Sequence, residues 1–167
     1  MKRFFIILTV LCIVGINSVC AQPMQKDGGL LNIGLGFLPG AGVNFSYDHG
    51  LIDQWGDGIF TVGGLIGFQS RRTFGEIDDH TFVFTPRATY RYAINNDFEV
   101  YASAMLGFQI YKVADKYNAA DFSGITAGCR YTFSGNISVF AEVSPPFHYV
   151  HDNISIAIFN GGLSISF

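Results

Sequence analysis

Apolar and polar residues alternate along most of the chain after residue 29. This period of two is typical of β-strands that have one apolar and one polar face. The last stretch shows it clearly, because Leu163, Ile165 and Phe167 alternate with Ser164 and Ser166. Eight runs of this kind occur, and they predict strands at residues 30–37, 42–48, 58–70, 81–92, 98–112, 123–133, 137–143 and 154–167.

The two faces of these runs differ in a way that indicates their surroundings. The apolar face is the larger one and ends in aromatic residues such as Phe37, Phe68 and Phe133, whereas the polar face consists mainly of Thr, Ser, Asn and Gly. A soluble barrel would turn a face rich in Lys and Glu to water, but a membrane barrel turns its apolar face to lipid. We therefore predict a closed transmembrane barrel, which pairs every backbone polar group within the protein.

The polar face carries a few charged residues of both signs. They are Arg87, Arg91, Glu99, Arg130 and Glu142. The interior of an eight-stranded barrel is only just wide enough for side chains, and buried charges must be paired. We interpret these residues as an interior ion-pair cluster that fills the barrel and fixes its register, and the alternative is a gate or a narrow polar pore. The inward-facing glycines, Gly34, Gly36, Gly63, Gly67, Gly107 and Gly128, are interpreted as packing residues of a crowded interior.

The predicted connections fall into a short and a long class. Residues 93–97 and 134–136 are short and rich in turn-forming residues, as periplasmic turns of such barrels are. Longer and more polar connections, expected to be outer loops, are residues 71–80, 113–122 and 144–153. The first hairpin departs from this pattern, because residues 38–41 are short and residues 49–57 are long. Either the barrel is atypical there or the first two strands are misplaced.

The N-terminal segment predicts export. Lys2 and Arg3 precede an apolar run over residues 4–14, and Val19 and Ala21 stand at the −3 and −1 positions of a cleavage site. This pattern indicates a secretory signal peptide at residues 1–21, followed by a barrel domain at residues 22–167. The apolar run is shorter than the roughly 20 residues that a spanning helix needs. Cys20 lacks the preceding residues of a lipoprotein signal, so ordinary cleavage is favoured.

Removal of residues 1–21 changes the charge and the cysteine count. Without Lys2 and Arg3, eight basic residues (10 − 2) face 13 acidic ones, a net charge of −5. An acidic chain without a basic patch argues against nucleic acid as a partner. Cys129 becomes the only cysteine, so no internal disulfide is expected. Cys129 is predicted to face lipid as a small apolar residue.

Candidate catalytic and metal-binding residues are confined to two predicted loops. They are Asp78, Asp79 and His80 in one loop and His148, His151 and Asp152 in the other. No spacing matches a known metal motif, so we expect solvated loops and no cofactor. His151 and Ser155 are four residues apart, about 13 Å along one strand, which is too far for direct proton exchange.

The chain resembles the small eight-stranded outer-membrane barrels of the OmpA-barrel, OmpX and opacity-protein type. The likeness lies in the signal peptide, residues 86–92, 128–131 and 140–143, and the terminal Phe167. Gly162, Ile165 and Phe167 also resemble the C-terminal signal that the barrel-assembly machinery reads. The resemblance implies an all-β, up-and-down barrel in the bacterial outer membrane, in contact with lipid and lipopolysaccharide.

The resemblance does not decide the activity, because this fold hosts adhesins, pores and enzymes. Lipid A deacylases of this fold carry a His-x-Ser arrangement that the spacing of His151 and Ser155 does not match. We expect a monomeric, non-enzymatic protein whose outer loops contact an extracellular or envelope partner. The alternatives are a narrow channel for small solutes and a lipid A-modifying enzyme.

Overall fold

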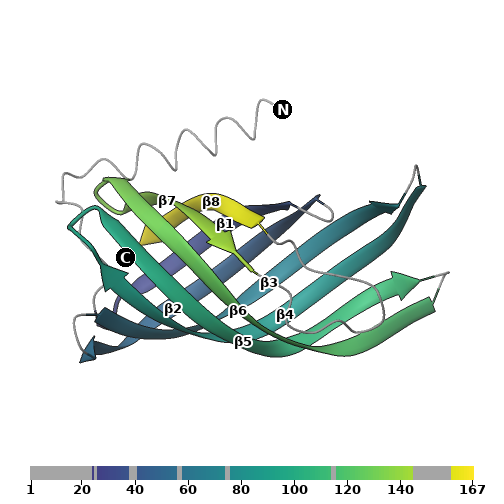
Figure 1. Cartoon of the computed structure of the whole chain (residues 1–167), viewed down its shortest axis with the longest axis horizontal. Helices are drawn as coiled ribbons and strands as arrows, with labels where there is room; N and C mark the ends of the chain where they lie inside the picture. Colours follow the sequence, from purple (N-terminus) through teal and green to yellow (C-terminus); the bar gives the residue numbers. More distant parts are fainter. Residues whose placement is uncertain are drawn as a thin grey trace.

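The computed structural model describes residues 24, 26–37, 41–55, 58–73, 76–113, 116–144 and 159–167. These residues form one elongated barrel of eight strands (Figure 1). The strands are β1 (Gly29–Phe37), β2 (Ala41–Trp55), β3 (Gly58–Thr73), β4 (Glu76–Ala93), β5 (Phe98–Val113), β6 (Lys116–Ser134), β7 (Ile137–Val143) and β8 (Phe159–Ser166). The predicted signal peptide lies outside the described residues.

Each strand pairs antiparallel with the next, and β8 pairs with β1, so that the sheet closes on itself. The prediction of an all-β, eight-stranded, up-and-down barrel is therefore confirmed. No helix of the described ranges is long and apolar enough to cross a membrane.

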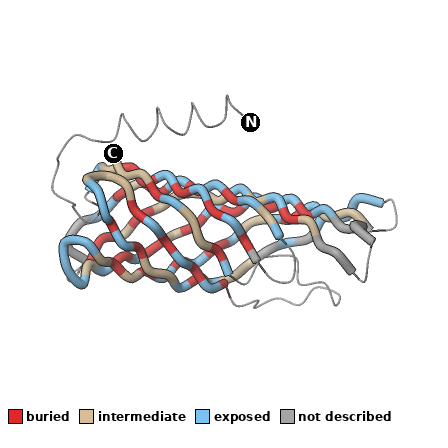
Figure 2. Tube along the Cα trace, turned by 90° about the horizontal axis from the view of Figure 1, so that it is seen from above, coloured by how far each residue is buried: buried red, intermediate tan, exposed pale blue. Residues whose placement is uncertain are grey.

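Burial alternates along the strands, as Figure 2 shows by its succession of buried and exposed positions. On β7, Ser138 and Glu142 are buried, whereas Val139 and Val143 are 42% exposed. The predicted faces are confirmed: large apolar side chains point outward and polar ones point into the barrel. This arrangement reverses that of a soluble protein, in which the apolar face is the buried one.

Several predicted strand ends are wrong. The segment at residues 49–57 is mostly strand, because β2 continues to Trp55 with register shifts after Gly50 and Ile52. The predicted outer loops at residues 71–80 and 113–122 are mostly strand as well. Polar residues continue backbone pairing in water, so alternating apolarity marks only the part of a strand at the apolar surface. Apart from Ser144, the loop at 144–153 and residues 154–158 of the predicted last strand lie outside the described residues.

The two short turns lie where the sequence predicts them. In the turn after β4, the Oδ1 atom of Asn95 accepts hydrogen bonds from the backbone N–H groups of Asp97 (2.9 Å) and Phe98 (2.8 Å). In the turn after β6, Gly135 has a φ of 47°, a backbone conformation that glycine adopts without strain. Local turn chemistry therefore ends these strands sharply.

The seam between β1 and β8 includes all three residues of the predicted assembly signal. Phe167 exchanges backbone hydrogen bonds with Gly29, at 2.7 and 2.9 Å. Ile165 pairs with Leu31 on β1, and a Cβ at Gly162 would fall well under 3.0 Å from the carbonyl oxygen of Ile33. Gly162 thus allows the close approach of the two strands, and Phe167 extends their backbone pairing by one residue.

Candidate functional site: the interior ion-pair cluster

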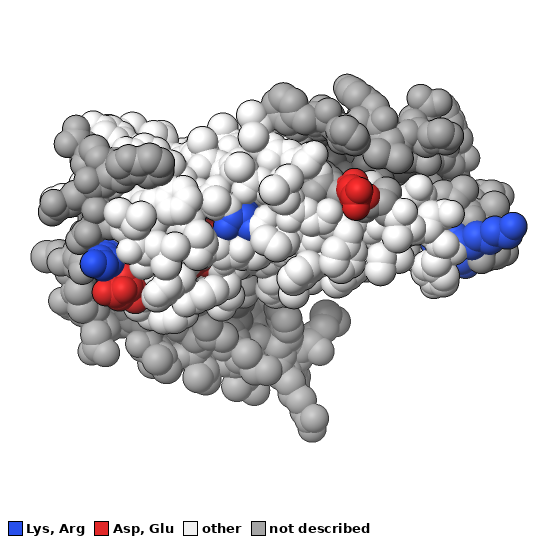
Figure 3. All heavy atoms as spheres, turned by 90° about the horizontal axis from the view of Figure 1, so that it is seen from below, with Lys and Arg blue, Asp and Glu red and all other residues white. Residues whose placement is uncertain are grey.

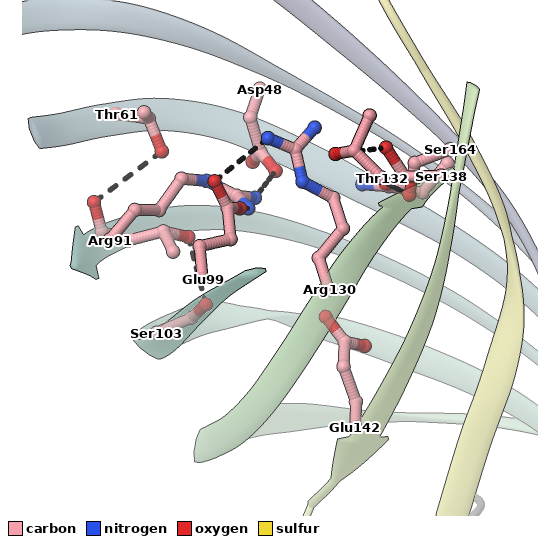
Figure 4. A network of polar contacts seen from close by, with 12 residues as sticks. Asp48, Thr61, Arg91, Glu99, Ser103, Arg130, Thr132, Ser138, Glu142 and Ser164 are labelled. Atoms are coloured by element: carbon pink, nitrogen blue, oxygen red, sulfur yellow. Dashed lines mark hydrogen bonds and ion pairs between the residues drawn. The ribbon is translucent and has the colours of Figure 1, made fainter. Parts of the chain in front are cut away.

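The structure brings all five predicted charged residues together inside the barrel. Each is at most 4% exposed, although they come from β4, β5, β6 and β7. Figure 4 shows several of these side chains converging from different strands. They occupy the inward positions of the alternating pattern, which is why the sequence indicates them.

Asp48 on β2 is a sixth member, which the sequence reasoning missed. Arg87 donates to both oxygens of its carboxylate, with Nε 2.7 Å from Oδ1 and Nη2 bonded to Oδ2. Arg91 donates to the same Oδ2 atom through Nη2, at 2.7 Å. Asp48 is fully buried and is the central acceptor of the cluster. Its spacing could have predicted its inward position, because Asp48 follows Asn44 and Ser46 at intervals of two residues on the same face of β2.

The remaining ion pairs join the arginines to two glutamates. Glu99 accepts from Arg91 Nη1 and from Arg130 Nη2, both at 2.7 Å, and Glu142 accepts from Arg87 Nη1 at 3.3 Å. Three arginines thus face three carboxylates, so the formal charges cancel. Mutual compensation is what makes buried charges tolerable away from water.

The ion pairs of Asp48 and Glu142 join strands that are not neighbours in the sheet, whereas those of Glu99 join neighbouring strands. Asp48 and Arg87 lie on β2 and β4, with β3 between them, and Glu142 reaches Arg87 from β7. Gly63 on β3 pairs with Asp48 on one side and with Arg87 on the other. Because Gly63 has no side chain, the carboxylate and the guanidinium can meet over β3. At this level the lumen is therefore occupied by ion pairs.

Neutral polar groups extend the network to the seam. Ser164 on β8 donates to Asn32 (2.5 Å), Asn32 donates to Ser46 (2.9 Å), and Arg87 also donates to Ser46 (2.9 Å). The guanidinium of Arg91 additionally lies 4.6 Å from the ring centroid of Tyr101, within cation–π range. The network therefore holds strands on opposite sides of the barrel in one register.

The other candidate residues form no recognisable site within the described ranges. Those ranges contain no group of three or more His, Cys, Asp and Glu that could hold a metal ion. His80 stacks on Phe68, with ring centroids 5.6 Å apart, and Cys129 is half-buried with a free thiol. Asp78 and Asp79 lie on β4, and nothing is described of their side chains. His148, His151, Asp152 and Ser155 lie outside the described residues.

Comparison with known proteins supports the fold. No family model and no curated protein matches the chain. A de novo designed transmembrane β-barrel matches 86% of this chain and 98% of its own, with a TM-score of 0.59 and 11% identity. The N-terminal barrel of Pseudomonas aeruginosa OprF matches 85% and 98%, with a TM-score of 0.59 and 14% identity. Yersinia pestis Ail in a nanodisc matches 85% and 100%, with a TM-score of 0.55 and 16% identity. The fold is that of small outer-membrane barrels.

Proposed function

We propose that this protein is a monomeric, non-enzymatic barrel of the bacterial outer membrane, with a closed lumen and a surface-interaction role. The observation that carries this proposal is the combination of an apolar exterior with ion pairs that cross the interior. Figure 3 supports the membrane setting, because the face drawn there has few charged side chains between its two ends. The likeness to solved transmembrane barrels supports the fold on which the proposal rests.

Two hairpins support the surface role. Pairing of β4 with β5 ends at Thr81 and Tyr111, whereas β3–β4 and β5–β6 continue as separate hairpins beyond that level. They extend from the end of the barrel opposite the C-terminus (Figure 1). On the second hairpin, Tyr117 is 75% exposed beside the exposed Lys116 and Asn118. An exposed aromatic side chain among polar neighbours is typical of protein-binding surfaces.

The orientation of the barrel in the membrane can be tested with single cysteines in a Cys129→Ser background. Asn118→Cys places a thiol on the extended β5–β6 hairpin, and Asn96→Cys is its matched control in the short turn at the other end. In intact cells, a maleimide attached to a large polyethylene glycol should label Asn118→Cys but not Asn96→Cys. Both should be labelled after lysis. Labelling of Asn96→Cys alone in intact cells would contradict an outward-facing hairpin.

Conductance distinguishes a closed barrel from the alternative of a narrow channel. The refolded protein should be electrically silent in a planar bilayer, because the ion pairs of Asp48, Arg87 and Glu142 cross its lumen. A different migration of boiled and unboiled protein on a detergent gel would verify that the protein tested is folded. Discrete current steps that change in Glu142→Gln would show a water path and favour the channel.

A further inference from the structure

A cavity lies inside the barrel between the ion-pair cluster and the end that carries the extended hairpins. It is partly open to solvent and is lined by residues of six strands, β1 to β5 and β8, and by Ser144 directly after β7. Among the lining residues are Leu65, Val83, Met105, Asn44, Ser144 and Asn160. An eight-stranded barrel has room for at most one small ligand besides its own side chains. This cavity is therefore the part of the interior where such a ligand would fit.

The lining differs from the rest of the interior in its chemistry. Leu65, Val83 and Met105 present apolar side chains, and Val83 and Met105 are each 4% exposed. Among the described residues that line the cavity, none is charged. Its polar groups are neutral, and they include the Asn44–Asn160 carboxamide pair, joined by a 2.9 Å hydrogen bond. A charged ligand would lose its hydration there without gaining a partner, so the lining favours an uncharged, largely apolar molecule.

Gly67 lines the cavity, and the surrounding backbone does not require a glycine at this position. A Cβ at Gly63 or Gly107 would fall well under 3.0 Å from a backbone oxygen, so those two positions require glycine. A Cβ at Gly67 would instead lie 3.7 Å from Leu65 Cδ2 and 3.9 Å from Val83 Cβ, which is ordinary contact. Close packing therefore does not require glycine at residue 67, unlike at residues 63 and 107. Glycine weakens a strand interior, and it often marks a site where a ligand approaches closely.

We infer that this cavity binds one uncharged aliphatic molecule. Its chain packs against Leu65, Val83 and Met105, and its neutral polar end lies at the Asn44–Asn160 pair. The apolar contacts supply the driving force for binding, and the carboxamides orient the molecule. An alkyl chain with a hydroxyl, ester or amide end has this chemistry. It can be supplied by a free aliphatic compound or by the chain of a membrane lipid.

The experiment follows the methyl groups of methionine by NMR, with ¹³C-methyl-methionine protein in phospholipid nanodiscs and 1-octanol as the probe. Met105 lines the cavity, whereas Met24 packs with Leu30 and Ile59 in a separate cluster and serves as the internal control. Octanol should shift the Met105 signal saturably and leave the Met24 signal unchanged. Equal, non-saturating shifts of both signals would indicate partition into the membrane and would overturn the inference.

Matched glycine variants locate the binding site. Gly67→Leu fills the cavity, and Gly64→Leu adds the same side chain on β3 at a position that points out of the barrel. Gly67→Leu should weaken octanol binding by about tenfold or more, and Gly64→Leu should bind like the wild type. If Gly67→Leu does not fold, as judged by gel migration, Val83→Phe fills the same space. An equal effect of the two glycine variants would overturn the inference.

Mass spectrometry of the protein released from nanodiscs distinguishes the two sources. A phospholipid retained by the wild type and by Gly64→Leu, but lost in Gly67→Leu, would assign the cavity to a lipid chain. Saturable octanol binding without retained lipid would assign it to a free aliphatic compound. Absence of both retained lipid and a saturable Met105 shift would show that the cavity takes no such ligand.

Discussion

Replacing Asp48 with asparagine is expected to lower the free energy of unfolding by about 3–5 kcal/mol, the scale of breaking a buried ion pair. The change removes one negative charge while keeping the size of the side chain. Arg87 and Arg91 would then share a neutral oxygen, and the buried cluster would carry a net positive charge. Both guanidinium groups are at most 3% exposed, so water cannot replace the lost carboxylate without rearrangement.

Urea titration of the protein in lipid vesicles, followed by the fraction that migrates as the folded form on a gel, measures this effect. Asp97→Asn is the control, because Asp97 is exposed in the turn after β4. Its free energy of unfolding should change by less than about 0.5 kcal/mol. An Asp48→Asn midpoint equal to that of the wild type would mean that solvent reaches Asp48 and that the lumen is open at this level.

Glu142→Gln should lower the free energy of unfolding by less than Asp48→Asn does. This order differs from the sequence analysis, which predicted Glu142 but not Asp48 as a member of the cluster. Glu142 contacts one arginine, at 3.3 Å, whereas Asp48 accepts from two arginines. The same urea titration therefore ranks the two carboxylates. A larger loss for Glu142→Gln would show that Asp48 is not the central acceptor.

The fold was predictable because the alternation of residues within each strand shows which side chains face the interior and which face outward. Period two assigns Arg130 inward and Tyr131 outward without knowledge of any other strand. Charges on an inward face then predict a cluster, because an eight-stranded interior cannot separate them widely. For this reason five of the six cluster members could be identified from local sequence alone.

The pairing within the cluster could not be predicted in the same way. Alternation gives the side of the sheet but not the height of a residue in the barrel, which depends on strand stagger. Asp48 bonds to Arg87 two strands away, and the register of both intervening pairings is needed to bring them together. Asp48 is also the last residue of the predicted strand 42–48, whereas β2 in fact continues to Trp55.

Gly63→Ala is expected to destabilise the barrel by about 3 kcal/mol or more, at the upper end of the range for overpacking. The added methyl group would fall well under 3.0 Å from the backbone carbonyl oxygen of Tyr47 and would also press on Asp48. Rigid backbone cannot move aside as a flexible side chain can, so β2 and β3 would have to separate locally. That separation would displace Asp48 from Arg87, which it meets over Gly63.

Gly64→Ala is a matched control, because Gly64 is the next residue on the same strand and points out of the barrel. An added Cβ there would meet its nearest atom, the carbonyl oxygen of Thr85, at 3.7 Å. This variant loses the same backbone freedom and adds the same methyl group, so its unfolding midpoint should stay close to that of the wild type. Equal destabilisation by both alanines would attribute the effect to the loss of glycine itself rather than to the contact with β2.

A double variant tests whether Gly63 acts through the ion pair. If the methyl group at residue 63 destabilises partly by displacing Asp48, that part is already lost in Asp48→Asn. Gly63→Ala combined with Asp48→Asn should then cost less than the sum of the two single changes, as is usual for residues in contact. Strict additivity would mean that Gly63 serves only the packing of β2 on β3. If the double variant loses at least about 1 kcal/mol less than the sum of the two single variants, the two positions are coupled. That result would show that the absence of a side chain at Gly63 allows Asp48 to reach Arg87 over β3.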